Sequence, residues 1–332
     1  MAFFSIVICT YNPDLEIFQR LLKAVLQFDK LSVQHEVIII DNNSSPALQM
    51  NDAVQSFLSS KQNATIITET KPGLTNARIA GIKAAKCDWI IFFDDDNEPA
   101  ADYLMCGTKA IELYPHVGAW EPGNIDVKYL CQKSNNYLDS IKAIFQQRES
   151  EEICFDNNKI NGNICYPYGT GMIIRKEILT VYINEVEKNL LTMSDRKGSS
   201  LLSGGDSQML YIGLRMGFYA GSAPSIKLTH NILPIKTKLV NVLKLVYSVN
   251  AGQIKAYNEV FPLHPYTLSE IKNSMLFKNL YIFIRQILRR PLKLKTALLD
   301  LSRHLGMAKA QLIAGNKNNL SLLGFWESVI GF

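Results

Sequence analysis

Several features that would place a chain of 332 residues in a special class are missing from this sequence. No stretch approaches the ~18 uncharged apolar residues that a membrane-spanning helix needs. The first five residues lack the basic lead of a secretory signal, so we expect the protein to stay in the cytosol. There is no internal repeat or low-complexity segment. The length therefore allows one large core with an appendage, or two modest domains.

Paired cysteines and a glycine-rich phosphate loop are also lacking. The cysteines form no C-x-x-C pair, so we expect free thiols rather than disulfides or zinc ligands; they are Cys9, Cys87, Cys106, Cys131, Cys154 and Cys165. The turn after the first predicted strand, Thr10 to Pro13, has none of the glycines of a dinucleotide-binding fingerprint. This absence argues against a nicotinamide-dependent oxidoreductase.

Acidic residues become scarce toward the carboxyl terminus. Residues 1–232 contain 21 Lys and Arg against 26 Asp and Glu, a net charge of −5, whereas residues 233–332 contain 14 against 4, a net charge of +10. We therefore predict two parts with different roles, residues 1–232 and residues 233–332, with a boundary near Leu233-Pro234.

The first part alternates between the apolar patterns of strands and helices. Strands are predicted at 3–9, 35–40, 64–69 and 90–93, and helices at 15–28, 47–59 and 74–85. Such alternation predicts an α/β fold with a mainly parallel sheet flanked by helices. A later strand is expected from Gly221 to His230.

The most informative stretch is the end of the strand at 90–93, where the apolar run stops at Asp94, Asp95 and Asp96. Three adjacent carboxylates repel one another unless a cation lies between them. Mg²⁺ and Mn²⁺ prefer carboxylate oxygens and share their remaining positions with substrate phosphates, which points to a nucleotide-diphosphate ligand. The alternative is a solvated acidic turn that opens a helix at Pro99.

Two further polar clusters follow predicted strands: Thr10-Tyr11-Asn12 after the first, and Asp41 to Ser44 after the second. In an open α/β sheet the ligand crevice lies at the carboxyl ends of the strands. We therefore expect these clusters to meet the acid run at one edge. Asp41 could accept from a pyrimidine N–H or a ribose hydroxyl, or could cap its own turn.

Four motifs carry a resemblance in their order and spacing: Ser5 to Asn12, Val37 to Ser44, Gly73-Leu74-Thr75-Asn76-Ala77-Arg78, and Asp94-Asp95-Asp96. Together they resemble the nucleotide-sugar half of a family 2 glycosyltransferase, and with later matches the resemblance covers roughly residues 3 to 232. It implies a GT-A fold, a nucleotide-diphosphate sugar donor, a divalent cation (Mn²⁺ or Mg²⁺) and inversion at the anomeric carbon.

By this resemblance, donor contacts fall on Thr10, Tyr11, Asn12, Asp41, Asn76, Arg78, Asp94 and Asp95, and the metal on Asp96. Arg78 could reach a base or a phosphate, although a salt bridge on a solvated helix face would give the same pattern. His230 would complete the cation site opposite Asp96, because neutral imidazole binds divalent metals; a structural histidine is the alternative.

Further matches concern catalysis and the acceptor. An inverting transfer needs a carboxylate to take the proton of the acceptor hydroxyl, and Asp206 is our candidate, with an ordinary helix N-cap as the alternative. Here the sequence departs from the family, which often has an acidic residue just before this aspartate, where this chain has Gly205. Weaker acceptor or phosphate candidates are Trp120, Glu121 and Arg175. Arg175 ends a glycine-rich strand, Gly169 to Arg175, that could equally contain a bulge.

The second part is expected to be helical and basic. Its helices, one of them from about Leu292 to Ala314, predict a surface that lies on anionic lipid, with Leu280, Phe283 and Ile287 available for insertion. They could instead pack on the catalytic domain. Nucleic acid is not expected, since no recognition pattern accompanies the charge.

The sequence thus predicts a metal-dependent inverting glycosyltransferase that acts on a saccharide acceptor, polyprenyl-linked at the inner face of the membrane, in surface polysaccharide synthesis. The alternative is a non-catalytic module that binds a nucleotide sugar or a glycan.

Overall fold

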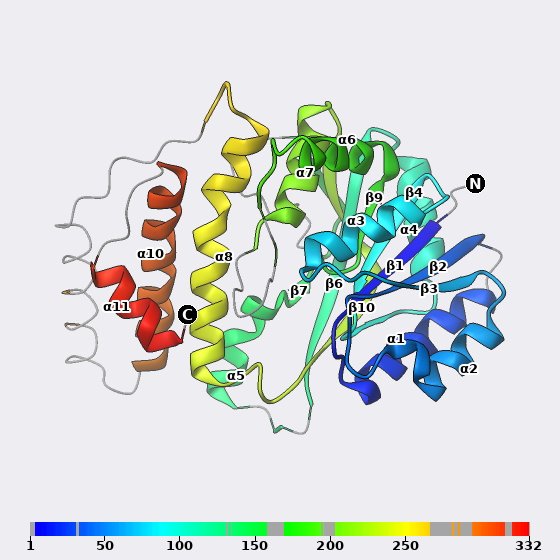
Figure 1. The fold of residues 1–332 in the computed structure, drawn as a ribbon, viewed down its shortest axis with the longest axis horizontal. Coiled ribbons are helices and arrows are strands. Elements are labelled where there is room, and N and C mark those ends of the chain that lie inside the picture. The colour runs from blue at the N-terminus through cyan, green and yellow to red at the C-terminus, as the bar shows by residue number, and fades with distance from the viewer. Residues whose placement is uncertain are drawn as a thin grey trace.

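The computed structural model describes residues 4–30, 33–130, 132–133, 135–157, 169–193, 195, 203–265, 281, 285, 294–315 and 321–331. The first part alternates strands and helices as predicted (Figure 1). Its elements, in chain order, are β1 (Phe4–Thr10), α1 (Leu15–Leu26), η1 (Gln27–Lys30), β2 (His35–Asp41), η2 (Leu48–Met50), α2 (Asp52–Ser60), β3 (Ala64–Thr68), α3 (Leu74–Ala84), β4 (Trp89–Asp94), β5 (Asn97–Pro99) and α4 (Tyr103–Leu113).

The chain continues through a less regular region into a helical carboxyl-terminal part. These elements are β6 (Val117–Tyr129), α5 (Asn136–Ile141), η3 (Lys142–Phe145), β7 (Arg148–Glu149), β8 (Cys154–Asp156), β9 (Met172–Arg175), α6 (Lys176–Glu187), α7 (Gly205–Arg215), β10 (Tyr219–Ile232), α8 (Leu239–Val260), α10 (Leu294–Ala314) and α11 (Ser321–Ile330).

One sheet organises the first part. Its strand order is β3-β2-β1-β4-β9-β6-β10-β5, with β7 beside β6 and β8 beside β10. The strands β1 to β4 are parallel, and β6 pairs in parallel with β10. The short strand β9 lies antiparallel between β4 and β6. The sheet is therefore mixed but mainly parallel, as expected, and β4 and β6 point the same way.

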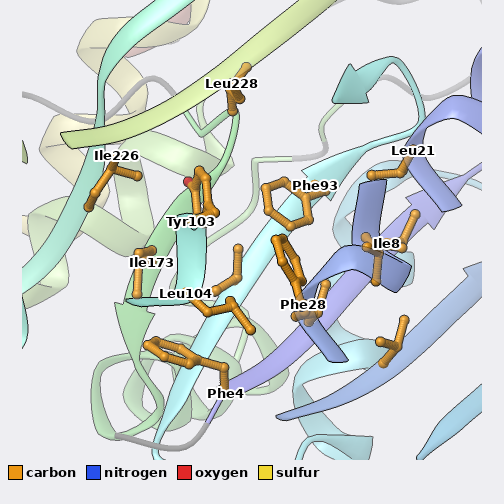
Figure 2. Packing of buried hydrophobic residues seen from close by; sticks show 14 of the residues in the cluster. Phe4, Ile8, Leu21, Phe28, Phe93, Tyr103, Leu104, Ile173, Ile226 and Leu228 are labelled. Carbon is orange, nitrogen blue, oxygen red and sulfur yellow. The ribbon is translucent and has the colours of Figure 1, made fainter. Parts of the chain in front are cut away.

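Both faces of the central strands are buried, which explains their continuous apolar runs. On one face Phe4, Ile8 and Phe93 pack against α1 and α4, whose buried residues include Leu21, Tyr103 and Leu104 (Figure 2). On the other face Val7, Ile40 and Phe92 pack against α3, α6 and α7. Because side chains alternate along a strand, each strand contributes to both cores.

Local sequence explains where two of the helices begin. The side chain of Asp14 accepts from the backbone amides of Glu16 and Ile17 and so caps α1. The side chain of Asn51 does the same for α2, so the helix predicted at 47–59 is divided into η2 and α2. Pro99 ends β5 rather than opening a helix, and α4 starts at Tyr103. The acid run therefore leads into a short strand, and the alternative of an acidic turn that opens a helix at Pro99 is wrong.

The thiols follow the expectation only in part. Cys9, Cys87 and Cys106 are free, whereas Cys154 in β8 is disulfide-bonded to a partner outside the described residues. The sequence pattern could not reveal this bond, because the spacing of cysteines along a chain does not report their spatial proximity.

The first helix of the second part, α8, contributes to one core of the sheet and to a third core. Tyr257, Val260 and Phe261 at the end of α8 belong to the core that contains α7, while Val242 and Val246 join a third core with α10 and α11. Figure 1 shows α8 lying between the sheet and α10. Leu280, Phe283 and Ile287, which we expected to insert into lipid, lie outside the described residues. Among the described helices, none is long and apolar enough to cross a membrane.

Candidate functional site

The three polar clusters meet at the carboxyl edge of the sheet. In the parallel registers Thr10 lies beside Asp41 and Cys9 lies beside Asp94, so the strand ends are adjacent. They border a cavity of about 510 Å³ whose lining includes residues 9–14, Asn42, Asn43, residues 72–74, residues 94–96, Leu233 and Lys236. This is the crevice that the strand order predicts for a ligand.

The turn after β1 combines one exposed ring with two anchored polar groups. Tyr11 is 63% exposed at the cavity, which leaves its ring free to contact a ligand. Asn12 has a positive φ of 47°, and its Oδ1 accepts from the amide of Ser45 at 2.8 Å. Thr10 Oγ1 donates to Asp95 Oδ2 at 2.6 Å. Asn12 and Thr10 therefore hold neighbouring segments in place around the cavity.

Asp41 and Asn76 face their own backbone. The buried carboxylate of Asp41 accepts from the amides of Ser44 at 2.9 Å and Leu48 at 3.0 Å, which is the turn-capping alternative. Asn76 Nδ2 donates to the carbonyl of Pro72 at 3.1 Å. Neither residue lines the cavity, where Asn42 and Asn43 of the same turn do. A donor contact from Asp41 or Asn76 stays a prediction.

The acid run is split between different environments. Thr170 Oγ1 donates to Asp94 Oδ2 at 3.4 Å. Burial, together with the neighbouring carboxylate of Asp96, raises the pKa of Asp95 to about 6, against the effect of the hydrogen bond from Thr10. Asp95 is therefore easier to protonate than an exposed aspartate.

Asp96 has a basic partner on each carboxylate oxygen. His230 Nε2 lies 3.3 Å from Oδ1, and Lys236 Nζ lies 2.5 Å from Oδ2. Burial alone would raise the pKa of Asp96, but His230 and Lys236 outweigh burial and lower it. Burial likewise opposes protonation of His230, and the nearby Asp96 outweighs it and raises the pKa of the imidazole. The structure therefore brings together the two residues that we predicted as metal ligands.

These two side chains suit a divalent cation. His230 Nδ1 lies 2.9 Å from the carbonyl oxygen of Phe145, so an Nδ1–H donated there leaves Nε2 directed at Asp96. Asp96 lines the cavity, and its carboxylate oxygen and the neighbouring imidazole nitrogen are ligands that Mn²⁺ and Mg²⁺ accept. Within the described part of the chain, no cluster of three or more His, Cys, Asp or Glu residues converges as a metal site.

Asp206 is paired with a buried arginine. Arg78 on α3 forms ion pairs with both Asp206 and Asp195, the latter at 3.2 Å. Burial would lower the pKa of Arg78, but Asp206 and Asp195 outweigh it and raise it, so the guanidinium stays charged. Arg78 is therefore not a residue of a solvated helix face: it is 4% exposed and joins α3 to α7.

Asp206 does not cap α7, because Asp195 occupies that place. The carboxylate of Asp195 accepts from the amides of Gly204 at 2.8 Å and Gly205 at 3.0 Å. A Cβ atom at residue 205 would overlap with Asp195 Oδ2. The family often has an acid just before the aspartate that corresponds to Asp206, and this chain has Gly205 there. The carboxylate of Asp195 fills the space beside that glycine.

The glycine-rich turn before β9 connects the acid run with Asp206. Gly169 has a positive φ of 92°, and a Cβ there would lie 2.5 Å from Asp206 Oδ2. The next residue, Thr170, is the one that donates to Asp94. The close approach that Gly169 permits is thus to Asp206. Residues 166–168 of the same motif lie outside the described residues.

The weaker acceptor candidates are not gathered at the cavity. Trp120 is fully buried in the core, and its Nε1 has no hydrogen-bond partner among the described residues. Glu121 is fully buried in an ion pair with Arg148. Arg175 pairs in register with Trp89 at the start of β4, about 16 Å of strand from Asp94, and its guanidinium stacks on that indole at 4.7 Å. We leave Trp120 and Arg175 out of the site that we propose.

Sequence reasoning missed Lys236 and Asp195. Lys236 is separated from Asp96 by 140 positions and Asp195 from Arg78 by 117, and neither belongs to a motif. One feature of the sequence hinted at a residue such as Asp195. Position 205 is a glycine where the family often has an acid, so the backbone amides at the start of that helix need a carboxylate from elsewhere in the chain.

Comparisons with known proteins identify a family and several relatives. The model of the family "Glycosyl transferase family 2" matches residues 5–182. An uncharacterized glycosyltransferase of Haemophilus influenzae is 28% identical over 162 residues, 48% of this chain and 50% of that protein. Polypeptide N-acetylgalactosaminyltransferase 8 of Drosophila melanogaster is 29% identical over 102 residues, 30% of this chain and 17% of that protein. The aligned part is thus half or less of the length of these relatives.

Solved structures show the same fold at low identity. The mannosyltransferase PcManGT of Pyrobaculum calidifontis, solved with GDP-Man and Mn²⁺, has a TM-score of 0.54 at 16% identity, covering 99% of this chain and 80% of that chain. GalNAc-T7 with UDP, GalNAc and Mn²⁺ has a TM-score of 0.51 at 15% identity, covering 74% and 48%. S. aureus TarS 1–349 has a TM-score of 0.50 at 13% identity, covering 96% and 93%. With a GT-A fold and a family model that matches more than half of its length, the chain belongs to glycosyl transferase family 2.

Proposed function

We propose that this chain is an inverting, divalent-metal-dependent glycosyltransferase that moves a sugar from a nucleotide-diphosphate donor to a saccharide acceptor. One observation carries the proposal: the Asp96–His230 pair and the arginine-held Asp206 approach the same strand-end region, linked through Thr170 and Gly169. A site for a donor diphosphate and a site for a proton acceptor are both needed for the transfer.

The donor would lie in the cavity at the carboxyl ends of β1, β2 and β4. Tyr11 offers an exposed ring to the base, and Asp94 and Asp95 offer oxygens to ribose hydroxyls. Asp96 and His230 would hold the cation, which, when bound, neutralises charge on the leaving diphosphate. The similar structures solved with GDP-Man or UDP and with Mn²⁺ support this choice of ligand.

Asp206 would act as the general base. As the acceptor oxygen attacks the anomeric carbon, its proton passes to the carboxylate, and the bond from that carbon to the diphosphate oxygen breaks on the opposite face. Arg78 fixes the position of this carboxylate and is itself held by Asp195. The result is inversion in a single displacement, with a nucleoside diphosphate as the second product.

We further propose that the acceptor is a lipid-linked saccharide of surface polysaccharide synthesis and that the carboxyl-terminal helices rest on anionic lipid at the inner face of the membrane. The net charge of +10 over residues 233–332 supports this. Phe325 and Val329, one turn apart on α11, are 65% and 53% exposed and offer an apolar face beside that charge.

The experiment is a panel of UDP- and GDP-sugars with Mn²⁺, in which released nucleotide is measured without an acceptor. We expect slow hydrolysis of one donor, lost on chelation and in Asp96→Asn but kept in Asp52→Asn, an exposed acid on α2. Calorimetry with UDP and GDP runs in parallel. Nucleotide binding that neither chelator nor Asp96→Asn changes would refute the metal site. Tight donor binding without any turnover would favour the non-catalytic binding module.

A further inference from the structure

Lys236 stands at the rim of the cavity in a short turn that follows β10. The amides of Lys236 and Thr237 donate to the carbonyls of Leu233 and Pro234 at 3.0 and 3.2 Å, which fixes the backbone of this turn. Lys236 lines the cavity beside the acid run, and its side chain is 41% exposed. A long lysine side chain with this exposure has room to change its rotamer.

The contact of Lys236 with Asp96 conflicts with a second cation on the same carboxylate. Its ammonium lies 2.5 Å from Asp96 Oδ2, while His230 faces Oδ1. A divalent ion ligated by Asp96 would bring like charge to contact distance of this ammonium, and like charges in a partly buried site repel strongly. The ion can therefore bind at Asp96 only if one of the two basic side chains moves away from that carboxylate. His230 is 9% exposed and anchored on Phe145, so Lys236 is the group that can leave.

The cavity supplies a destination for the displaced ammonium. Its lining includes Thr10, Asn12, the acid run 94–96 and Lys236 itself. A nucleoside diphosphate bound there would carry negative charge to within the reach of a lysine side chain, and lysine binds phosphate as a mobile point charge.

We propose that Lys236 alternates between two anions: it neutralises Asp96 in the empty protein and moves to the diphosphate of the donor when that carboxylate is needed for the cation. The proposal deepens the proposed function and rests on it. It assigns to Lys236 a role in binding the donor diphosphate and in restraining cation binding until the donor arrives.

The test compares Lys236→Met with Lys238→Met, an equal loss of charge at an exposed position two residues away. Binding of Mn²⁺ alone is followed by electron paramagnetic resonance, and binding of UDP and GDP with Mn²⁺ by calorimetry. We expect Lys236→Met to bind Mn²⁺ more tightly than the wild type in the absence of nucleotide, because the competing ammonium is gone. We expect its affinity for the nucleoside diphosphate to fall roughly 10-fold or more, the scale of a lost charge-assisted hydrogen bond.

The outcomes separate this proposal from the proposed function. Lys238→Met should behave as the wild type in both measurements, and Lys236→Arg should restore much of the nucleotide affinity. If Lys236→Met bound the nucleotide as the wild type does, the assignment of Lys236 would be overturned and the proposed function would stand. If the wild type bound neither UDP nor GDP with Mn²⁺, both would be overturned.

Discussion

Replacing Gly205 by alanine tests whether Asp195 occupies the place of the acid that the family often has in this motif. In an exposed helix, such a change stabilises by up to about 1 kcal/mol through helix propensity. Here the new methyl carbon would overlap with Asp195 Oδ2, because the backbone at residue 205 lies against that carboxylate. We therefore expect Gly205→Ala to destabilise the protein.

The magnitude follows from the contacts that Asp195 would lose. To restore a normal contact distance, its carboxylate must retreat by roughly 1 Å. The bonds from the amides of Gly204 and Gly205, now 2.8 and 3.0 Å, would then stretch beyond hydrogen-bonding range. Hydrogen bonds from backbone amides to a charged acceptor contribute about 1.5–3 kcal/mol each. Partial relaxation of the surrounding structure and the higher helix propensity of alanine offset some of this loss. A net loss of about 2 kcal/mol is expected.

The assay is equilibrium unfolding in urea, read as a shift of the midpoint at constant slope. Gly213→Ala, in the same helix, is the matched control: the nearest atom to its methyl would be the terminal methyl of Ile178, at 3.0 Å. A double-mutant cycle isolates the cause, since in an Asp195→Ala background the methyl has room and Gly205→Ala should cost nothing. If Gly205→Ala stabilised the wild type, or cost the same in both backgrounds, Asp195 would not be the group that limits this position.

Two further predictions concern catalysis and membrane contact. Asp206→Asn should lower the transfer rate by about 10²- to 10⁴-fold. Donor affinity and melting temperature should change little, because Arg78 keeps Asp195 as an ion-pair partner. Transfer at the wild-type rate would exclude Asp206 as the base. Full-length protein should sediment with anionic but not zwitterionic vesicles at low salt. The double substitution Phe325→Ser and Val329→Ser should weaken this sedimentation, whereas Met50→Ser, at an exposed apolar residue on η2, should not. If vesicle binding were the same in all of these variants, α11 would not be part of the contact. The full chain is needed, since a chain ending near Leu233 would lack α8, whose Tyr257 and Val260 belong to the core around α7.

Asp96 shows what sequence could predict about the site and why. Strand periodicity placed the acid run at the end of β4, and parallel pairing then required it to lie beside the ends of β1 and β2. The pairing of Asp96 with His230 depended on the family resemblance, because no periodicity links two residues so far apart. Asp41 was left open between a ligand contact and a turn cap, and the structure shows the cap.

Arg175 shows where the same reasoning failed. The apolar pattern from Met172 to Arg175 identifies a strand but carries no information about its direction. Antiparallel insertion of β9 between β4 and β6 sends Arg175 to the edge opposite the acids, and the same turn of the chain brings Gly169 to Asp206. Strand direction is set by how the chain connects and packs, which a local pattern does not encode.

The sequence by itself determined the alternation of strands and helices, the position of the acid run at a strand end and the basic character of the carboxyl-terminal part, because each depends on neighbouring residues. Only the tertiary structure decided which distant charges meet: Lys236 with Asp96, and Asp195 with Arg78 beside Asp206. Buried charges need partners, and the folded chain supplies them from whichever segments lie close in space. The partners that set the charge and position of the candidate catalytic groups therefore come from outside every motif that the sequence displays.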